Sequence, residues 1–344
     1  MRRLTLILSD LYLPEEAGAG EIGRGAGTEY LPLPELERLL RFARQTIPID
    51  DWRKLLAGQV GCASLASVAP AHFAARGQVP AGRVHSSWFA TPVHLEARLD
   101  HVRLDQHGLL RLQVGERLAW CEEFARSFGP ELALHDAGAR GFFLSGLESQ
   151  PVSSTDPARM LGADIASSLA RGDGAAPLRR LSAEIDMWLH GAALNRERER
   201  ARAPRISSLW LWGGTRAADD VTEVAPDTQR AYAGDDPWLA ALARAQTGAA
   251  PWPAPEGLCA FKPAPRHGIV ELTPLSESHD GLARLDANWL GPARAALAAG
   301  TLEQVEIVAN DGYFITQRHD SWRFWRRPRH WMELLRRPRV AAQA

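Results

Sequence analysis

The sequence predicts an α/β protein with a mixed, mainly parallel sheet flanked by helices and a β-hairpin near its C-terminus. The run Leu4–Leu8 is continuously apolar and stops at Ser9 and Asp10, which is typical of a buried parallel strand with polar residues at its carboxyl end. Apolar residues recur at helical spacing across 177–200. The segment 305–316 contains two apolar runs around Asn-Asp-Gly, a turn sequence that tolerates positive φ. Together these patterns indicate an α/β fold.

Length and composition allow two ordinary domains. The chain has 344 residues, of which 45% are hydrophobic and 24% charged, so it can build globular cores. The stretch 153–174 is rich in Ser, Ala, Gly and Asp, which favours a boundary or long connection. We therefore expect an N-terminal α/β region with antiparallel strands at 1–160. A C-terminal α/β region with the hairpin and a basic tail would follow at 175–344, unless the two form one composite domain.

The charge balance and the apolar runs bear on partners and location. Forty basic residues face 41 acidic ones, so no overall field favours a membrane or a polyanion. The first apolar run ends after five residues, which is too short for a signal peptide, and no run reaches the roughly 18 residues of a membrane span. Three scattered cysteines argue against a disulfide framework or structural zinc. We expect a soluble, cytoplasmic protein without membrane contact.

Three further segments have strand patterns. Residues 93–104 alternate between apolar and polar, which predicts one half-buried strand. Residues 131–146 indicate a hairpin around Asp136. Residues 206–212 are apolar enough for a buried central strand.

Two helices and one loop complete the pattern. Residues 33–46 predict an amphipathic helix, and 237–245 a helix capped by Asp235 or Asp236. The glycine-rich stretch 18–27 lacks the order of a dinucleotide-binding motif and predicts a mobile loop.

One segment resembles a known family. Leu189–Arg196, Pro204 and Ser208–Gly214 are similar to a helix–loop–strand motif of the RpfE-like bacterial regulatory proteins. That family is related to the cofactor-independent, archaeal-type phosphoglycerate mutases of the alkaline-phosphatase superfamily. The first strand with Asp10, Thr91–Leu95 and Trp322–Arg327 also resemble the family. In this chain Ser207 stands where Asn is expected and Thr215 interrupts the glycine ending.

The resemblance implies a shortened alkaline-phosphatase-like fold and a chemistry that this chain does not fully supply. Such mutases use two divalent metals, held by Asp and His from several strand ends, to activate a Ser or Thr nucleophile. Here Asp10 follows the first strand, but Leu11 occupies the position of the usual Gly. Three His-Asp pairs occur in reverse order, at 135–136, 279–280 and 319–320.

We therefore expect a phosphoglycerate-mutase-like protein with a degenerate metal site, no required cofactor and a regulatory or binding role. Its partner would be a phosphorylated small molecule or a protein. The candidate ligand-binding residues are Asp10, Asn195 and Arg196, and Arg196 would hold a phosphate through its planar guanidinium.

The enzymatic alternative is an active metal-dependent phosphoglycerate mutase that binds Mn or Zn through rearranged ligands. His94 and Asp100 are its weak metal candidates, since one strand would place both on the same face. Ser9 and Ser145 follow apolar runs and are the serines to consider as nucleophiles, although no base is placed by sequence.

The second alternative is a nucleic-acid-associated protein. The tail 318–339 interleaves arginines with aromatic residues, which can contact phosphates and stack on unpaired bases. Its candidate residues are Arg323, Trp325, Arg326 and Arg327. The competing interpretation is a terminal segment whose tryptophans pack on the protein.

Overall fold

The first apolar run forms strand β1 (Arg3–Leu8), inside a six-stranded sheet ordered β2–β12–β11–β1–β10–β9. The computed structural model describes residues 2–13, 31–106, 108–147, 151–214, 224–261, 266–277, 280–323 and 325–336. Strand β1 is parallel to β10 (His267–Leu272) and β11 (Gln304–Ala309), and β9 (Arg230–Ala233) is parallel to β10. Strands β12 (Gly312–Gln317) and β2 (Gln45–Pro48) add antiparallel pairings. The predicted mixed, mainly parallel sheet is confirmed.

The chain divides into two compact units, each made of separate segments. The first unit comprises 1–55, 226–234 and 251–344, and the second comprises 56–225 and 235–250. The predicted regions 1–160 and 175–344 stay a prediction, because compactness does not test which segments fold independently.

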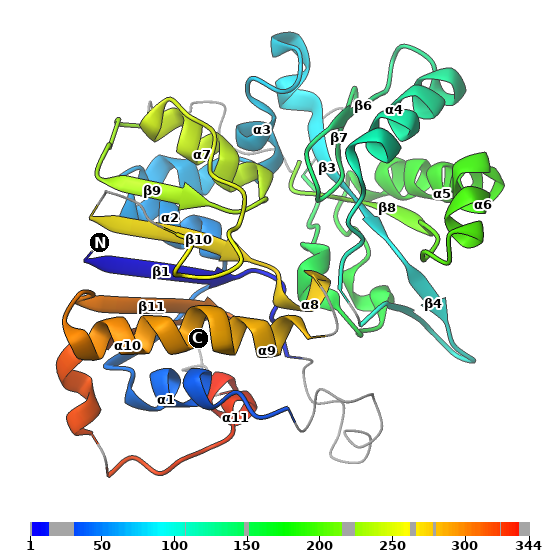
Figure 1. Ribbon diagram of the computed structural model, residues 1–344. Helices are drawn as coiled ribbons and strands as arrows, with labels where there is room; N and C mark the ends of the chain where they lie inside the picture. Colours follow the sequence, from blue (N-terminus) through cyan, green and yellow to red (C-terminus); the bar gives the residue numbers. More distant parts are fainter. Residues whose placement is uncertain are drawn as a thin grey trace. The chain divides into compact units, whose positions relative to one another are not determined.

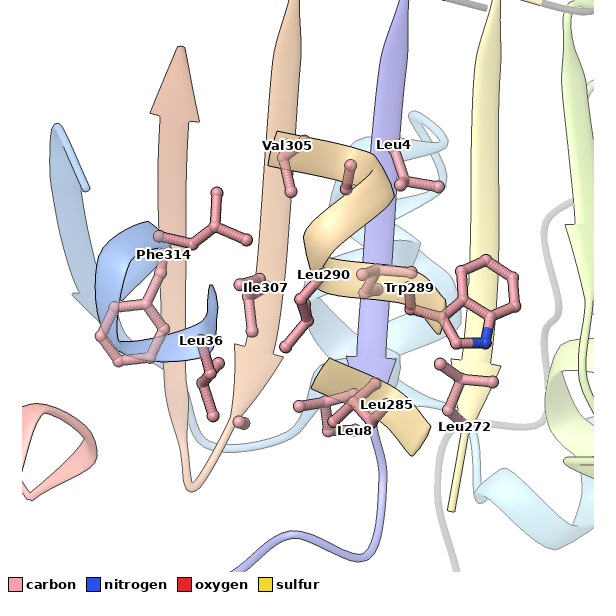
Figure 2. Close-up of a cluster of buried hydrophobic side chains, with 14 of the residues drawn as sticks. Leu4, Leu8, Leu36, Leu272, Leu285, Trp289, Leu290, Val305, Ile307 and Phe314 are labelled. Atoms are coloured by element: carbon pink, nitrogen blue, oxygen red, sulfur yellow. The ribbon is translucent and has the colours of Figure 1, made fainter. Parts of the chain in front are cut away.

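One face of the six-stranded sheet carries the apolar core of the first unit. Alternate residues of β1 (Leu4, Leu6 and Leu8) point to this face and are almost completely buried. Figure 2 shows Leu285, Trp289 and other helix side chains packed on it. The helices of this layer are α1 (Pro34–Phe42), α9 (Gly281–Leu285), α10 (Gly291–Ala299) and α11 (Trp331–Leu335), with a π-helical turn at Asp286–Leu290. The period of two in the strand thus separates this core from the opposite, more polar face.

The second unit is built on an antiparallel sheet ordered β6–β7–β3–β8. These strands are β6 (Ala133–Asp136), β7 (Phe142–Ser145), β3 (Ser87–Val93) and β8 (Ser208–Trp212). Helix α4 (Val114–Phe128) packs on β6 and α5 (Ala175–Gly191) on β8 (Figure 1). The remaining α-helices of the described residues are α2 (Trp52–Gln59), α3 (Pro70–Ala75), α6 (Ala193–Arg200), α7 (Pro237–Thr247) and α8 (Pro274–Glu277).

The prediction that 206–212 is a central strand is wrong. Strand β8 lies at the end of its sheet and pairs only with β3 among the described strands. All five of its residues are nevertheless buried. Leu209 and Leu211 pack in one core with α5, and on the other face Trp210 and Trp212 donate to Thr155 and Thr91. The apolar composition of 206–212 therefore indicates that the strand is buried, but it does not indicate whether the strand lies at the centre or at the edge of the sheet.

The prediction of one strand over 93–104 is also wrong. Strand β3 ends at Val93, and the chain continues as a hairpin of β4 (Leu95–Ala97) and β5 (Val102–Leu104). The backbone N–H of Arg98 donates to the carbonyl of His101 at 2.9 Å, which closes the turn. A hairpin shares the period of two with a single strand, so alternation alone did not distinguish them.

Two predicted helices are shorter or interrupted. The helix expected over 33–46 ends at Phe42, since the Arg44 N–H donates to the Ile315 carbonyl and the chain joins the sheet edge. The helix expected over 177–200 breaks at Ala192, whose ψ of 136° is extended, into α5 and α6.

The strongest local predictions are confirmed. Strands β11 and β12 form the hairpin, and Asn310 and Asp311 have positive φ of 47° and 56°. The hairpin at 131–146 is formed by β6 and β7. Asp236 caps α7 by accepting from the N–H groups of Trp238 and Leu239. Among the described residues, no helix has the length and apolar content that a membrane crossing requires. The glycine-rich loop at 18–27 lies outside the described residues.

Candidate functional site

Polar side chains gather where β1 and β10 end. Because the two strands are parallel, Ser9 and Asp10 follow β1 at the same edge of the sheet at which Thr273 follows β10 (Figure 1). All three residues are buried. This is the edge at which open parallel sheets place their ligand sites.

The carboxylate of Asp10 is bound by Ser276. Its Oδ2 accepts from the Ser276 backbone N–H at 2.8 Å and from the Ser276 hydroxyl at 2.9 Å. Ser276 lies in the short helix α8, which begins just after β10. Asp10 is completely buried. Its hydrogen bonds with Ser276 join the end of β1 to the segment that follows β10.

A second buried carboxylate, Glu271, lies beside Ser9. The Ser9 hydroxyl donates to Glu271 Oε1, and the Ser9 N–H donates to the Leu272 carbonyl at 3.0 Å. Gly234 approaches Glu271 closely, because a Cβ at Gly234 would lie 2.9 Å from the Glu271 Cβ. Sequence reasoning missed Glu271, although a single acidic residue near the end of the apolar run 268–272 was a usable signal.

Among the described residues, the side chains at this edge supply fewer ligands than two divalent metals require. Carboxylates and hydroxyls are suitable ligands for Mg²⁺ or Mn²⁺. Within the described parts of the chain, however, no three His, Cys, Asp or Glu side chains are grouped so that they could hold a metal ion. The described residues thus do not fit the two-metal centre that the resemblance implies.

Ser145 has a base beside it. Its Oγ lies 2.8 Å from Nε2 of His135 on the neighbouring strand β6, and burial lowers the pKa of His135. Ser145 is fully buried, so substrate cannot reach this hydroxyl in the described conformation. Of the other two His-Asp pairs, 319–320 belongs to a 3₁₀ turn in which Asp320 is buried, and His279 lies outside the described residues.

The hairpin separates the two weak metal candidates. His94 lies before β4, and its Nδ1 is 2.9 Å from the Arg205 carbonyl, so Nδ1 carries the proton and donates. Asp100 lies in the turn, with 86% of its side chain exposed, and pairs with Nδ1 of His101 at 2.6 Å. The hydrogen bond and charge of His101 lower the pKa of Asp100. The metal hypothesis required His94 and Asp100 to lie on the same face of one strand. In the described hairpin they do not.

Asn195 has a structural environment. Its Nδ2 donates to the carbonyls of Leu189 at 2.8 Å and Ile206 at 2.9 Å, and its Oδ1 accepts from the Ile206 N–H at 2.9 Å. Both amide hydrogens are used, and the residue is completely buried. Asn195 thus connects the end of α5 to the segment that leads into β8.

Arg196 is exposed, and its Nη1 donates to the Gly191 carbonyl at 2.8 Å. Asn195 and Arg196 belong to the second unit and Asp10 to the first, so each is described within its own unit.

The tail arginines divide into two groups. Arg323 donates to the Ala43 carbonyl at 3.1 Å, and Arg326 to the carbonyls of Arg41 and Ala43 at 2.9 and 2.7 Å. These carbonyls lie at the end of α1, where the helix dipole is negative. Arg327 is exposed, as is Trp325.

A buried ionisable network occupies the opposite, polar face of the sheet. The Thr5 hydroxyl lies 2.8 Å from both Glu306 Oε2 and His267 Nε2. Since it has one hydrogen and the carboxylate only accepts, His267 Nε2 donates to Thr5. Arg3 forms an ion pair with Glu306 and donates to the Tyr313 hydroxyl at 3.3 Å.

The network shifts several pKa values. Burial lowers the pKa of His267 to about 4, aided by the positive charge of Arg3. Burial opposes ionisation of Glu306, but the hydrogen bond and charge of Arg3 outweigh it and leave the pKa of Glu306 lowered. Burial and the Glu306 charge raise the pKa of Tyr313. The network therefore consists of one ion pair with neutral neighbours at pH 7.

Comparison with known proteins gives distant structural similarities. No protein-family model matches the chain, and no curated protein matches it significantly in sequence. A cofactor-independent phosphoglycerate mutase from Thermoplasma acidophilum DSM 1728 aligns with a TM-score of 0.33 and 14% identity, over 93% of this chain and 94% of its own. The PH0037 protein from Pyrococcus horikoshii aligns with a TM-score of 0.42 and 14% identity, over 92% of this chain and 87% of its own. At these values neither similarity carries an argument about activity.

Proposed function

We propose that this chain is a phosphoglycerate-mutase-like protein that binds a phosphorylated small molecule or a protein partner in a regulatory role, without catalysing phosphoryl transfer. The observation that supports this proposal is the double hydrogen bond from Ser276 to Asp10. In the family resemblance Asp10 is the residue that would hold a metal. Here its Oδ2 connects the turn after β1 to helix α8.

The neighbouring pair supports the same conclusion. Ser9, which precedes Asp10 in the sequence, donates its hydroxyl to Glu271, and both residues are buried. A serine that serves as a nucleophile needs a base and access to substrate. The contacts of Ser9 instead stabilise the adjacent ends of β1 and β10, which is a structural role.

A coupled assay for interconversion of 3- and 2-phosphoglycerate with added Mn²⁺ tests the absence of catalysis. We expect no turnover from wild-type protein whose folding is verified by circular dichroism. Asp10→Asn, which keeps the shape of the side chain, and Glu303→Gln, an exposed carboxylate of the same unit, serve as matched variants. Turnover that requires Mn²⁺ and is lost in Asp10→Asn but not in Glu303→Gln would contradict the proposal.

Binding is tested separately by isothermal titration of the wild-type protein with 3-phosphoglycerate. Heat of binding without turnover supports a small-molecule role. If 3-phosphoglycerate does not bind, it is excluded as the ligand, and another phosphorylated small molecule or a protein partner is the remaining form of the proposal.

A further inference from the structure

Two tryptophans on the C-terminal segment of the first unit are largely exposed. Trp322 and Trp325 are 59% and 56% exposed, and their rings form a T-shaped pair with centroids 4.7 Å apart. Large aromatic side chains gain most by burial, so two adjacent exposed indoles are a candidate binding surface.

Hydrogen bonds to α1 and to Asp320 hold the segment that carries Trp322 and Trp325. Arg323 and Arg326 alternate with the tryptophans and donate to the carbonyls at the end of α1. Asp320 is buried, accepts from the Gln317 N–H at 2.8 Å and lies 3.3 Å from Arg44. These contacts hold the backbone in place, so the two indoles are presented outward without a cost of ordering them on binding.

The segment that carries the tryptophans is rich in positive charge. The described residues 318–336 contain six arginines but only Asp320 and Glu333 as acidic residues. Arg318, Arg327 and Arg329 are exposed and form no ion pair with any described residue. An excess of exposed arginines in one segment attracts an anionic partner although the whole chain is nearly neutral.

We propose that Trp322, Trp325, Arg318, Arg327 and Arg329, here called the tail platform, bind single-stranded nucleic acid. Exposed indole faces stack on unpaired bases, and unpaired guanidinium groups contact the phosphates between them. A duplex hides its base faces, and an acidic peptide offers charge without planar rings. Arg323 and Arg326 position the platform, whereas the three exposed arginines contact the nucleic acid.

Fluorescence anisotropy of a labelled 20-nucleotide oligo-dT, titrated with the full chain, tests the proposal. Trp322→Ala and Trp325→Ala should each weaken binding by about five- to a hundredfold, the usual effect of losing one stacked base. Trp252→Ala is the matched control, because Trp252 is 49% exposed in the same unit. It should leave the affinity unchanged.

The charge contribution has its own readout. With three phosphate contacts, the logarithm of the affinity should fall against the logarithm of the salt concentration with a slope of about −2. Arg327→Gln and Arg329→Gln should each make this slope shallower by about 0.7. Arg284→Gln, an exposed arginine on α9, should not change it. Thermal unfolding of every variant verifies that the comparison is made on folded protein.

Several outcomes would overturn the proposal. Absence of binding by folded wild-type protein would do so, and so would equal affinity for a duplex, since stacking on unpaired bases would then be wrong. Binding of phosphatidylserine vesicles through the tryptophans, without binding of the oligonucleotide, would instead assign the tail platform to a lipid surface. None of these outcomes depends on the carboxyl edge of the sheet or on phosphoglycerate.

Discussion

The carboxylate of Asp10 accepts two hydrogen bonds from Ser276, one from the backbone N–H at 2.8 Å and one from the hydroxyl at 2.9 Å. The two residues are 266 positions apart in the sequence. They hold the end of β1 against the start of α8, at the edge where a parallel sheet builds its ligand site. The relationship gives Asp10 a measurable structural role.

We expect Asp10→Ala to destabilise the protein by about 2–3 kcal/mol, because a hydrogen-bonded, buried carboxylate is lost. Ser276→Ala removes only the hydroxyl and should cost about 1 kcal/mol. Urea unfolding measures both values, with Glu303→Gln as the surface control. An Asp10→Ala protein as stable as wild type would show that the carboxylate is not needed to hold the two segments together.

Asn195 allows a comparison between neighbouring residues. Asn195→Ala leaves two carbonyls and one N–H without their partner in a buried site and should cost about 3 kcal/mol. Arg196→Ala, on the exposed side of the same helix, should change stability by less than about 0.5 kcal/mol. Thermal unfolding distinguishes them. If Arg196→Ala were the more damaging, the assignment of Asn195 as the connection between α5 and β8 would be wrong.

We expect His267 to make the free energy of unfolding sensitive to acid. Its folded pKa of about 4 lies below the unfolded value near 6.5, so the unfolded state binds more protons between these two pH values. The stabilisation is present above pH 6.5 and is lost as the pH falls toward 4. Between pH 7.5 and pH 5 the loss should be about 2 kcal/mol.

Chemical denaturation across this pH range tests the effect of His267. His267→Gln should flatten the dependence, whereas His319→Gln, an exposed histidine of the same unit, should not. A pH profile that His267→Gln leaves unaltered would mean that other groups cause the acid sensitivity.

The turn of the C-terminal hairpin gives a prediction about backbone conformation. Asp311 has φ of 56°, which β-branched residues rarely adopt. Asp311→Val should therefore destabilise the protein by about 1–2 kcal/mol more than Asp311→Gly, since both remove the carboxylate and only valine is strained at this φ. Equal effects of the two substitutions, measured by urea unfolding, would exclude backbone strain as the cause.

The confirmed predictions rest on neighbouring residues. Asn310 and Asp311 form a tight turn between two apolar runs, and Asp236 caps the helix that begins at the next residue, Pro237. The failures concern partners distant in sequence. Alternation over 93–104 fits one strand as well as the observed hairpin, and apolar composition over 206–212 indicates burial without position in the sheet.

The sequence by itself determined the α/β class, the parallel first strand with its polar end and the local turns and caps, because each depends on side-chain period or on contacts within a few residues. Only the tertiary structure decided what the candidate residues do. Asp10 meets Ser276, Glu271 meets Ser9, and Arg326 meets the end of α1 across more than 250 positions. The residue type alone does not distinguish a charged side chain that holds two segments together from one that binds a ligand. Their roles differ through burial and through the hydrogen-bond partners that the fold brings to them.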